Sequence, residues 1–222
     1  IVRDTTVSIL ATGKKIKNKG NWIRFPYYHH VYDDEREGFS TQLRYLSNYG
    51  QFISLEESVS LINGDTPLDG RYFCITFDDG LKNCFTNACP ILVEQDIPAA
   101  FYVVSSLIGK TLEPGNPIAT DVFGYSSRES SLSFMGWDDC RSVLDNNMMI
   151  ASHTDTHQRL GELTLEQQRA ELVKSKIEIE AQLGQPCAHF CAPYGIPGVD
   201  FNLSVLSRIA KEAGFCSLVT GV

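Results

Sequence analysis

Short apolar runs alternate with segments of helical spacing along this chain. The clearest run, 72–77, consists of β-forming residues between Gly70 and Gly80, which is typical of a buried strand. Further strands are predicted within 1–21 and over 22–31, 99–104, 148–151, 187–191 and 215–219. Helices are predicted over 39–48, 55–62, 83–95, 137–144, 164–183 and 201–213. This alternation of strands and helices indicates parallel βαβ units in an α/β fold.

Capping residues fix the ends of two of these helices. Ser54 with Glu57 three residues later, and Thr164 with Gln167, both have the spacing of a capping box. Gly184 is expected to end the second helix. By contrast, 105–135 is long, polar and rich in Gly, Pro and Ser, so we expect a loop that walls a substrate groove.

Length and charge narrow the class of protein. The chain has 222 residues, which fits a single catalytic domain over 1–222. Hydrophobic residues make up 43% of it, enough for a sizeable core, and the formal net charge is -8. Nucleic acid and anionic membrane surfaces are therefore poor partners. We also expect no membrane span, because no apolar stretch approaches the roughly 20 residues that one needs.

The 7 cysteines show no metal-knuckle spacing and most lie in apolar segments. We expect reduced, buried thiols and a cytoplasmic protein without a secretory signal. The sequence begins at Ile1, so removal of a leader stays open.

Two adjacent carboxylates, Asp78 and Asp79, follow the clearest strand and precede Gly80. Ligands and catalytic groups gather at the carboxyl ends of parallel strands. Neighbouring acids face different ways there, so one can bind a metal while the other acts as a base. The alternative is that they only cap the next helix, as Asp often does.

Histidines follow two other predicted strands. His29 and His30 end one of them, and His153 and His157 follow another at a spacing that places both rings on one side of a helical turn. Two imidazoles and one carboxylate form a common hydrolytic metal set with a position left open for water. Each pair alone also fits ordinary surface histidines, but beside Asp79 the metal site is favoured.

These motifs together resemble the polysaccharide deacetylases (NodB homology, carbohydrate esterase family 4). The resemblance covers roughly 22–220, and its motifs are 76–80 (TFDDG), 152–157 (SHTDTH) and 190–195 (FCAPYG). It implies a distorted (β/α) barrel of about seven parallel strands. The implied activity is metal-dependent removal of acetyl groups, chiefly N-acetyl, from a sugar in a polysaccharide or glycan precursor.

The resemblance also implies residue roles. Asp79, His153 and His157 would bind one divalent metal, zinc being the first choice and other divalent transition metals being acceptable. Asp78 would be the general base, and the backbone N–H of Tyr194 in the Pro193-Tyr194 segment would help to hold the oxyanion. Among aromatic residues, Trp137 and Tyr125 are further candidates for contact with the sugar.

The chain departs from the usual family pattern in two places. Cys191 stands where many members carry an Arg that orients the catalytic carboxylate, and no histidine follows His189 to serve as the late catalytic acid. The segment 28–31 (YHHV) resembles the Tyr-His-x-Val of a circularly rearranged branch, in which an early histidine replaces the late one and the Arg is usually missing. The resemblance therefore assigns the acid to His29, with His30 pointing the other way. The alternative is that both are exposed histidines and that the acid lies beyond Val222.

Two alternatives stay open at this point. The chain could be a metal-dependent amidase acting on a non-sugar C–N bond, or a degenerate barrel that only binds glycan. Intact acids and histidines in the first two motifs argue against the second, because a binding module needs no base beside a metal.

Overall fold

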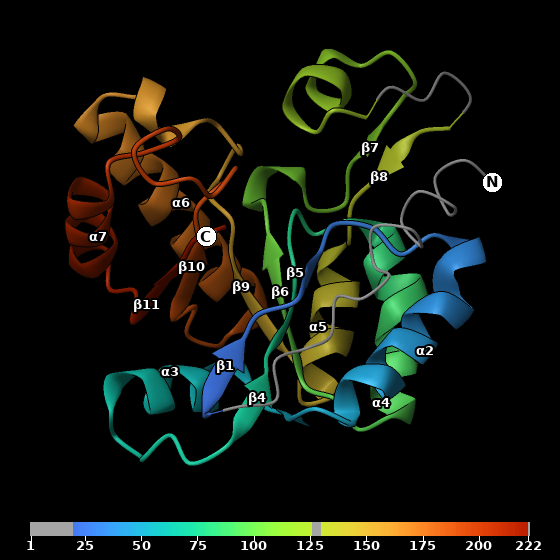
Figure 1. Cartoon of the computed structure of the whole chain (residues 1–222). Helices are drawn as coiled ribbons and strands as arrows, with labels where there is room; N and C mark the ends of the chain where they lie inside the picture. The colour runs from blue at the N-terminus through green and yellow to red at the C-terminus, as the bar shows by residue number, and fades with distance from the viewer. Residues whose placement is uncertain (1–19, 126–129, 222) are drawn as a thin grey trace.

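Parallel strands at the centre and helices around them form a distorted (β/α) barrel (Figure 1). This computed structural model describes residues 20–125 and 130–221, so the strand expected within 1–21 lies mostly outside the described residues. The main sheet has six strands in the order β11-β10-β9-β6-β5-β2, all paired in parallel. A three-stranded parallel sheet, β1-β4-β3, continues it.

Two of the barrel strands are interrupted. β1 (Trp22–Arg24) and β2 (Tyr27–Tyr28) are separated at Phe25 and Pro26, and β4 (Arg71–Phe73) and β5 (Ile75–Phe77) at Cys74. The other parallel strands are β3 (Gln51–Phe52), β6 (Ala99–Val103), β9 (Met149–Ser152), β10 (His189–Cys191) and β11 (Ser217–Val219). When each interrupted pair is joined, the described residues contain the expected seven parallel strands.

Helices cover the outside of the sheet, mostly where the sequence predicts them. They are α2 (Arg36–Ser47), α3 (Leu55–Asn63), α4 (Cys89–Glu94), α5 (Trp137–Asp145), α6 (Leu165–Leu183) and α7 (Leu203–Glu212). Both predicted capping boxes form, at Ser54 and at Thr164, and Gly184 ends α6 in the left-handed conformation. The helix expected over 83–95 is divided into a π-helical turn, Cys84–Ala88, and α4, because Pro90 has no N–H for the regular ladder.

The segment 105–135 is more structured than expected. It contains an antiparallel hairpin of β7 (Thr111–Leu112) and β8 (Leu132–Ser133) and a π-helical turn, Ile118–Val122. Buried apolar side chains give it a small core of its own; the members are Leu81, Val104, Leu107, Leu112, Ala119, Leu132 and Phe134. The loop prediction from composition was therefore wrong for part of this segment, because scattered apolar residues pack there without a clear period.

The two faces of the sheet differ in the size of their side chains. On the outer face, Phe77 and Phe101 stack at 4.6 Å within the large core under the helices. The inner face carries mainly smaller side chains around one large one, and Leu55 of α3 packs with them; the buried members from the barrel strands are Cys74, Ala100, Tyr102, Ala151 and Cys191. Since side chains alternate along a strand, the same strands supply both cores.

All seven cysteines are free thiols, and six of them are buried. Within the described part of the chain, we find no helix of the length and apolarity needed to cross a membrane.

Candidate active site

The turn after β5 separates the two carboxylates. The N–H of Asp78 continues the strand by donating to the carbonyl of Tyr28 at 2.9 Å. Asp79 and Gly80 then both adopt positive φ, 70° and 71°. Asp tolerates this region better than most residues, whereas a Cβ at Gly80 would also lie 3.1 Å from Val103. The positive φ of Asp79 therefore ends the extended strand geometry between the two acids.

His153 is held at the end of β9 with one ring nitrogen already used. Its N–H donates to the carbonyl of Val103 at 2.9 Å, which continues the pairing with β6. Its Nδ1 lies 2.9 Å from the carbonyl oxygen of Cys191. Because a carbonyl only accepts, Nδ1 carries the hydrogen, and the lone pair of Nε2 remains available to a metal.

His157 reaches the same place through a tight loop and not through the expected helical turn. Thr154 and His157 have positive φ values of 68° and 61°, which a right-handed helix excludes. The His157 N–H donates to Thr154 Oγ1 at 3.0 Å. The loop is fixed to α6 because the N–H and hydroxyl of Thr156 donate to the Glu171 carboxylate at 2.8 and 2.7 Å. The helical interpretation of the His-x-x-x-His spacing was therefore wrong, although the two rings do meet.

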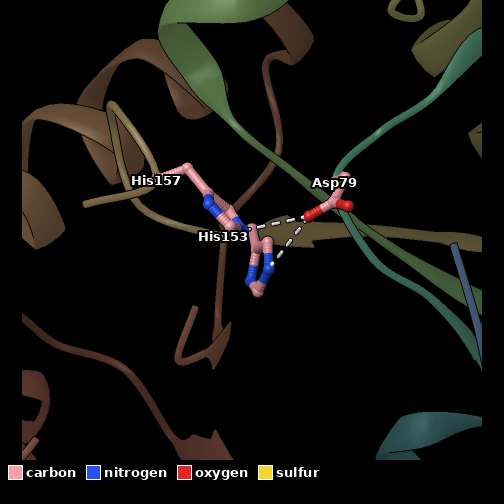
Figure 2. A group of neighbouring side chains, drawn as sticks. All are labelled: Asp79, His153 and His157. Carbon is pink, nitrogen blue, oxygen red and sulfur yellow. Dashed lines mark ion pairs between the residues drawn. The ribbon is translucent and has the colours of Figure 1, made fainter. Parts of the chain in front are cut away.

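Asp79, His153 and His157 form one buried group (Figure 2). Asp79 Oδ1 lies 3.4 Å from His153 Nε2 and 3.1 Å from His157 Nε2, and the two ring centroids are 4.9 Å apart. Potential ligand atoms of all three residues lie within 4.8 Å of one another. The three residues are at most 6% exposed. This donor set and spacing fit one divalent metal ion.

Electrostatics within the group favour an ionised carboxylate. Burial opposes ionisation of Asp79, but the imidazoles of His153 and His157 hold its pKa below the usual value. Burial lowers the pKa of His157 and the neighbouring His153 acts in the same direction, while the adjacent Asp79 opposes that change. A neutral His157 beside an ionised Asp79 is the protonation state that a metal needs.

Asp78 lies beside this group with a different electrostatic environment. Burial raises its pKa above the usual value, although the nearby His153 and His29 act in the opposite direction. Its Oδ1 is buried and has no hydrogen-bond partner within the described residues. A carboxylate with a raised pKa in a cleft has the properties of a general base.

A cavity of about 750 Å³ opens over these residues, within the size range of small-molecule sites. Asp78, Asp79, His153, His157 and His29 all line it. Its other walls are largely apolar; they include Phe25, Tyr27, Ile62, Val122, Phe123, Tyr194 and Ile196. Val122 and Phe123 belong to the segment 105–135, which therefore contributes a wall as the sequence suggests.

His29 comes to the site from the neighbouring strand. β2 pairs with β5 in parallel, with Tyr28 opposite Phe77, so the residues after each strand lie side by side. The expected adjacency of these strands is present, and His29 lines the same cavity as Asp78.

Tyr194 occupies the rim of the cavity in a strained turn. Its φ is 63°, and the N–H of Gly195 donates across it to the carbonyl of Pro193 at 2.8 Å. Gly195 is required there because a Cβ would lie 2.6 Å from the backbone nitrogen of Gly221. The Tyr194 N–H makes no hydrogen bond within the described residues and is free to bind an oxygen atom.

Two predicted contact residues lie elsewhere. Trp137 starts α5 and packs, partly buried, against the outer core, so it is not among the residues that line this cavity. Tyr125 lines a smaller cavity beside His30. Sequence reasoning missed the apolar wall at Phe25, Tyr27 and Phe123. The available signal was that the side chains of residues 25, 27 and 29 share one face of an extended strand.

Comparison with known proteins decides the family. Residues 65–216 match the profile of the family described as polysaccharide deacetylase. The chain belongs to the polysaccharide deacetylase family. The matched region of this family member contains Asp78, Asp79, His153, His157 and Tyr194, whereas His29 precedes it.

One relative of this polysaccharide deacetylase family member is distant in sequence. Bacillus subtilis (strain 168) YxkH, named as a polysaccharide deacetylase, is 22% identical over 204 residues, covering 91% of this chain. The alignment covers 61% of that relative's length.

Two solved structures of similar fold are IcaB from Ammonifex degensii and a de-N-acetylase from Aggregatibacter actinomycetemcomitans. The first has a TM-score of 0.75 at 20% identity, covering 91% of this chain and 84% of that one. The second has a TM-score of 0.70 at 20% identity, covering 89% and 87%. At this identity the similarities establish the barrel fold.

Proposed function

We propose that this protein hydrolyses acetyl groups, chiefly N-acetyl, from a sugar of a polysaccharide or glycan precursor with the help of one divalent metal ion. The observation that carries the proposal is the buried Asp79–His153–His157 group with Asp78 beside it in a cavity of about 750 Å³. Family membership and the de-N-acetylase among proteins of similar fold support this reaction class.

Asp79, His153 and His157 would hold the metal, zinc by preference for two imidazoles and a carboxylate. When bound, the ion supplies a Lewis acid that polarises a carbonyl oxygen and lowers the pKa of water. The fit rests on the Nε2 of His153, which faces Asp79 Oδ1, while the Nδ1 of the same ring is fixed on the Cys191 carbonyl.

The remaining chemistry is assigned to the chain's own groups. Asp78 removes a proton from the attacking water, whose oxygen forms a bond to the acetyl carbon. The Tyr194 N–H donates to the carbonyl oxygen as negative charge develops there. His29 gives a proton to the sugar nitrogen as the C–N bond breaks, which releases acetate and a free amine.

The apolar walls suit the substrate class, because the C–H faces of a pyranose pack on aromatic and aliphatic side chains. Tyr27 is 56% exposed and Tyr194 38% exposed, so both offer ring surface at the cavity. The carboxylates and histidines that line the same cavity would face the reacting acetyl group.

The test is acetate release from N-acetylglucosamine oligomers and from O-acetylated sugars, with and without a chelator. We expect release from the N-acetylated substrate that stops with chelator and returns with added zinc. Release from a non-sugar acetamide alone would indicate an amidase. Binding of oligomers without acetate release under any metal would indicate a non-catalytic glycan-binding barrel.

A further inference from the structure

Tyr102 places a hydroxyl group inside the barrel without a hydrogen-bond partner. The residue lies on β6, is 0% exposed, and its hydroxyl oxygen is unpaired within the described residues. A buried polar group of this kind is unfavourable and rare in native proteins, so it calls for an explanation. An apolar Phe would fill the same volume without that disadvantage.

The sheet register places Tyr102 between the two halves of the candidate site. Phe77 of β5 is paired with Phe101 of β6, so Asp78 and Tyr102 occupy the next register position. On its other side, Tyr102 is paired with Ala151 of β9, two residues before His153. The Tyr102 and His153 rings are 6.5 Å apart, between centroids.

Asp78 and Tyr102 also project from the same face of the sheet. Side chains alternate along a strand, so Asp78 shares the inner face with Thr76, and Tyr102 shares it with Ala100. Neighbouring strands are only about 4.8 Å apart, which brings these two side chains within reach of one shared water molecule.

The two groups complement each other chemically. Asp78 Oδ1 is a buried acceptor without a donor, and the Tyr102 hydroxyl is a buried donor without an acceptor. The other polar neighbours whose charge acts on Tyr102 are the thiols of Cys191, Cys74 and Cys187, which are weak hydrogen-bonding groups. Burial above all raises the pKa of Tyr102 well above its usual value, so the hydroxyl keeps its hydrogen for donation.

We propose that Tyr102 is a positioning residue whose hydroxyl donates to one buried water that in turn donates to Asp78 Oδ1, and so fixes the carboxylate for proton transfer. The inference rests on the proposed function for the kinetic role, whereas the contact itself does not depend on turnover. In this role Tyr102 acts through the base and does not contact the substrate.

The first test is the stability of Tyr102→Phe in two backgrounds. In the wild-type background, loss of the donor to a buried carboxylate should lower the thermal midpoint by about 2–4 °C. In the Asp78→Ala background the same substitution should leave the midpoint unchanged or raise it, because the acceptor is gone. An equal change of the thermal midpoint in both backgrounds, or a higher midpoint for Tyr102→Phe in the wild-type background, would overturn the inference. This holds whether or not the protein is active.

The second test is kinetic. On a substrate that the wild type deacetylates, Tyr102→Phe should lower kcat about tenfold with KM within twofold and metal content unchanged. The control is Tyr72→Phe, which removes a hydroxyl bonded to Asp69 at 3.0 Å, away from the cavity. If the wild type turns over the substrate and Tyr102→Phe is equally fast, the positioning role is refuted and the proposed function is not affected. Absence of turnover in the wild type would instead count against the proposed function.

Discussion

His29 and His30 are adjacent in the chain but line two different cavities. His29 lines the large cavity with Asp78 and Asp79, whereas His30 lines one of about 190 Å³. His30 stacks on Tyr32 with 4.9 Å between ring centroids, and its Nδ1 lies 3.0 Å from Asn83 Nδ2. The two side chains therefore lie on opposite sides of the chain, as predicted for the end of this strand. Substitution of each histidine in turn gives a test variant and its matched control.

We expect His29→Ala to lower turnover on an amide substrate by roughly 10²–10⁴, the usual contribution of acid–base catalysis. His30→Ala should change it little, because that ring does not line the catalytic cavity. The measurement is kcat for both variants on an N-acetylated sugar. Near-normal rates for His29→Ala would move the acid to another group.

Loss of one metal ligand should abolish tight metal binding. His157→Ala removes one of three donors that lie within 4.8 Å of one another. We expect bound zinc, measured by elemental analysis after dialysis, to fall from one equivalent to well below that in His157→Ala and to remain at one in His30→Ala. Full zinc occupancy in His157→Ala would refute the assigned ligand set.

The thiols offer a test of the fold that does not depend on activity. Six cysteines are buried and Cys216 is exposed. A chromogenic disulfide reagent should therefore react rapidly with one thiol in the native protein and with all seven after denaturation without reductant. Fewer than seven in the denatured protein would reveal a disulfide bond, and several rapid native reactions would contradict the buried positions.

Alkaline pH should weaken the fold through these buried thiols. Burial raises the pKa of Cys74 from 9.0 to about 11. A group with a raised folded pKa stabilises the fold fully below the unfolded pKa and loses that contribution as pH rises through the folded one. The urea midpoint should therefore fall between pH 9 and about 11, and less steeply in Cys74→Ser. If the urea midpoint falls equally steeply with pH in both proteins, ionisation of the Cys74 thiol does not contribute to the loss of stability.

Local rules allowed much of the fold to be predicted from sequence. The capping residues Ser54 and Thr164 fixed two helix starts, since a side-chain oxygen and the first turn of a helix suffice for that interaction. The strand before Asp78 was recognisable because apolar β-formers end abruptly at two acids. Predictions that depended on contacts between distant segments were less accurate.

Three particular residues show why. The positive φ of His157 depends on a loop that Glu171 fixes from another helix, so spacing alone suggested a helical turn that is absent. Trp137 was expected at the site but packs against the outer core. The presence of an aromatic residue in a sequence does not indicate which side of the sheet its helix covers. Tyr102 attracted no attention in an apolar run, because its significance comes from the register between β5 and β6.

The central claim is that Asp78 is the base of a metal-dependent deacetylase, and one measurement tests it most directly. Acetate release from an N-acetylated oligosaccharide should be compared for wild type and Asp78→Asn at equal, measured metal content. The amide keeps the shape of the side chain but cannot accept the water proton, so we expect turnover to fall by at least about 10² while zinc stays bound. A zinc-loaded Asp78→Asn enzyme that releases acetate as fast as the wild type would contradict the account.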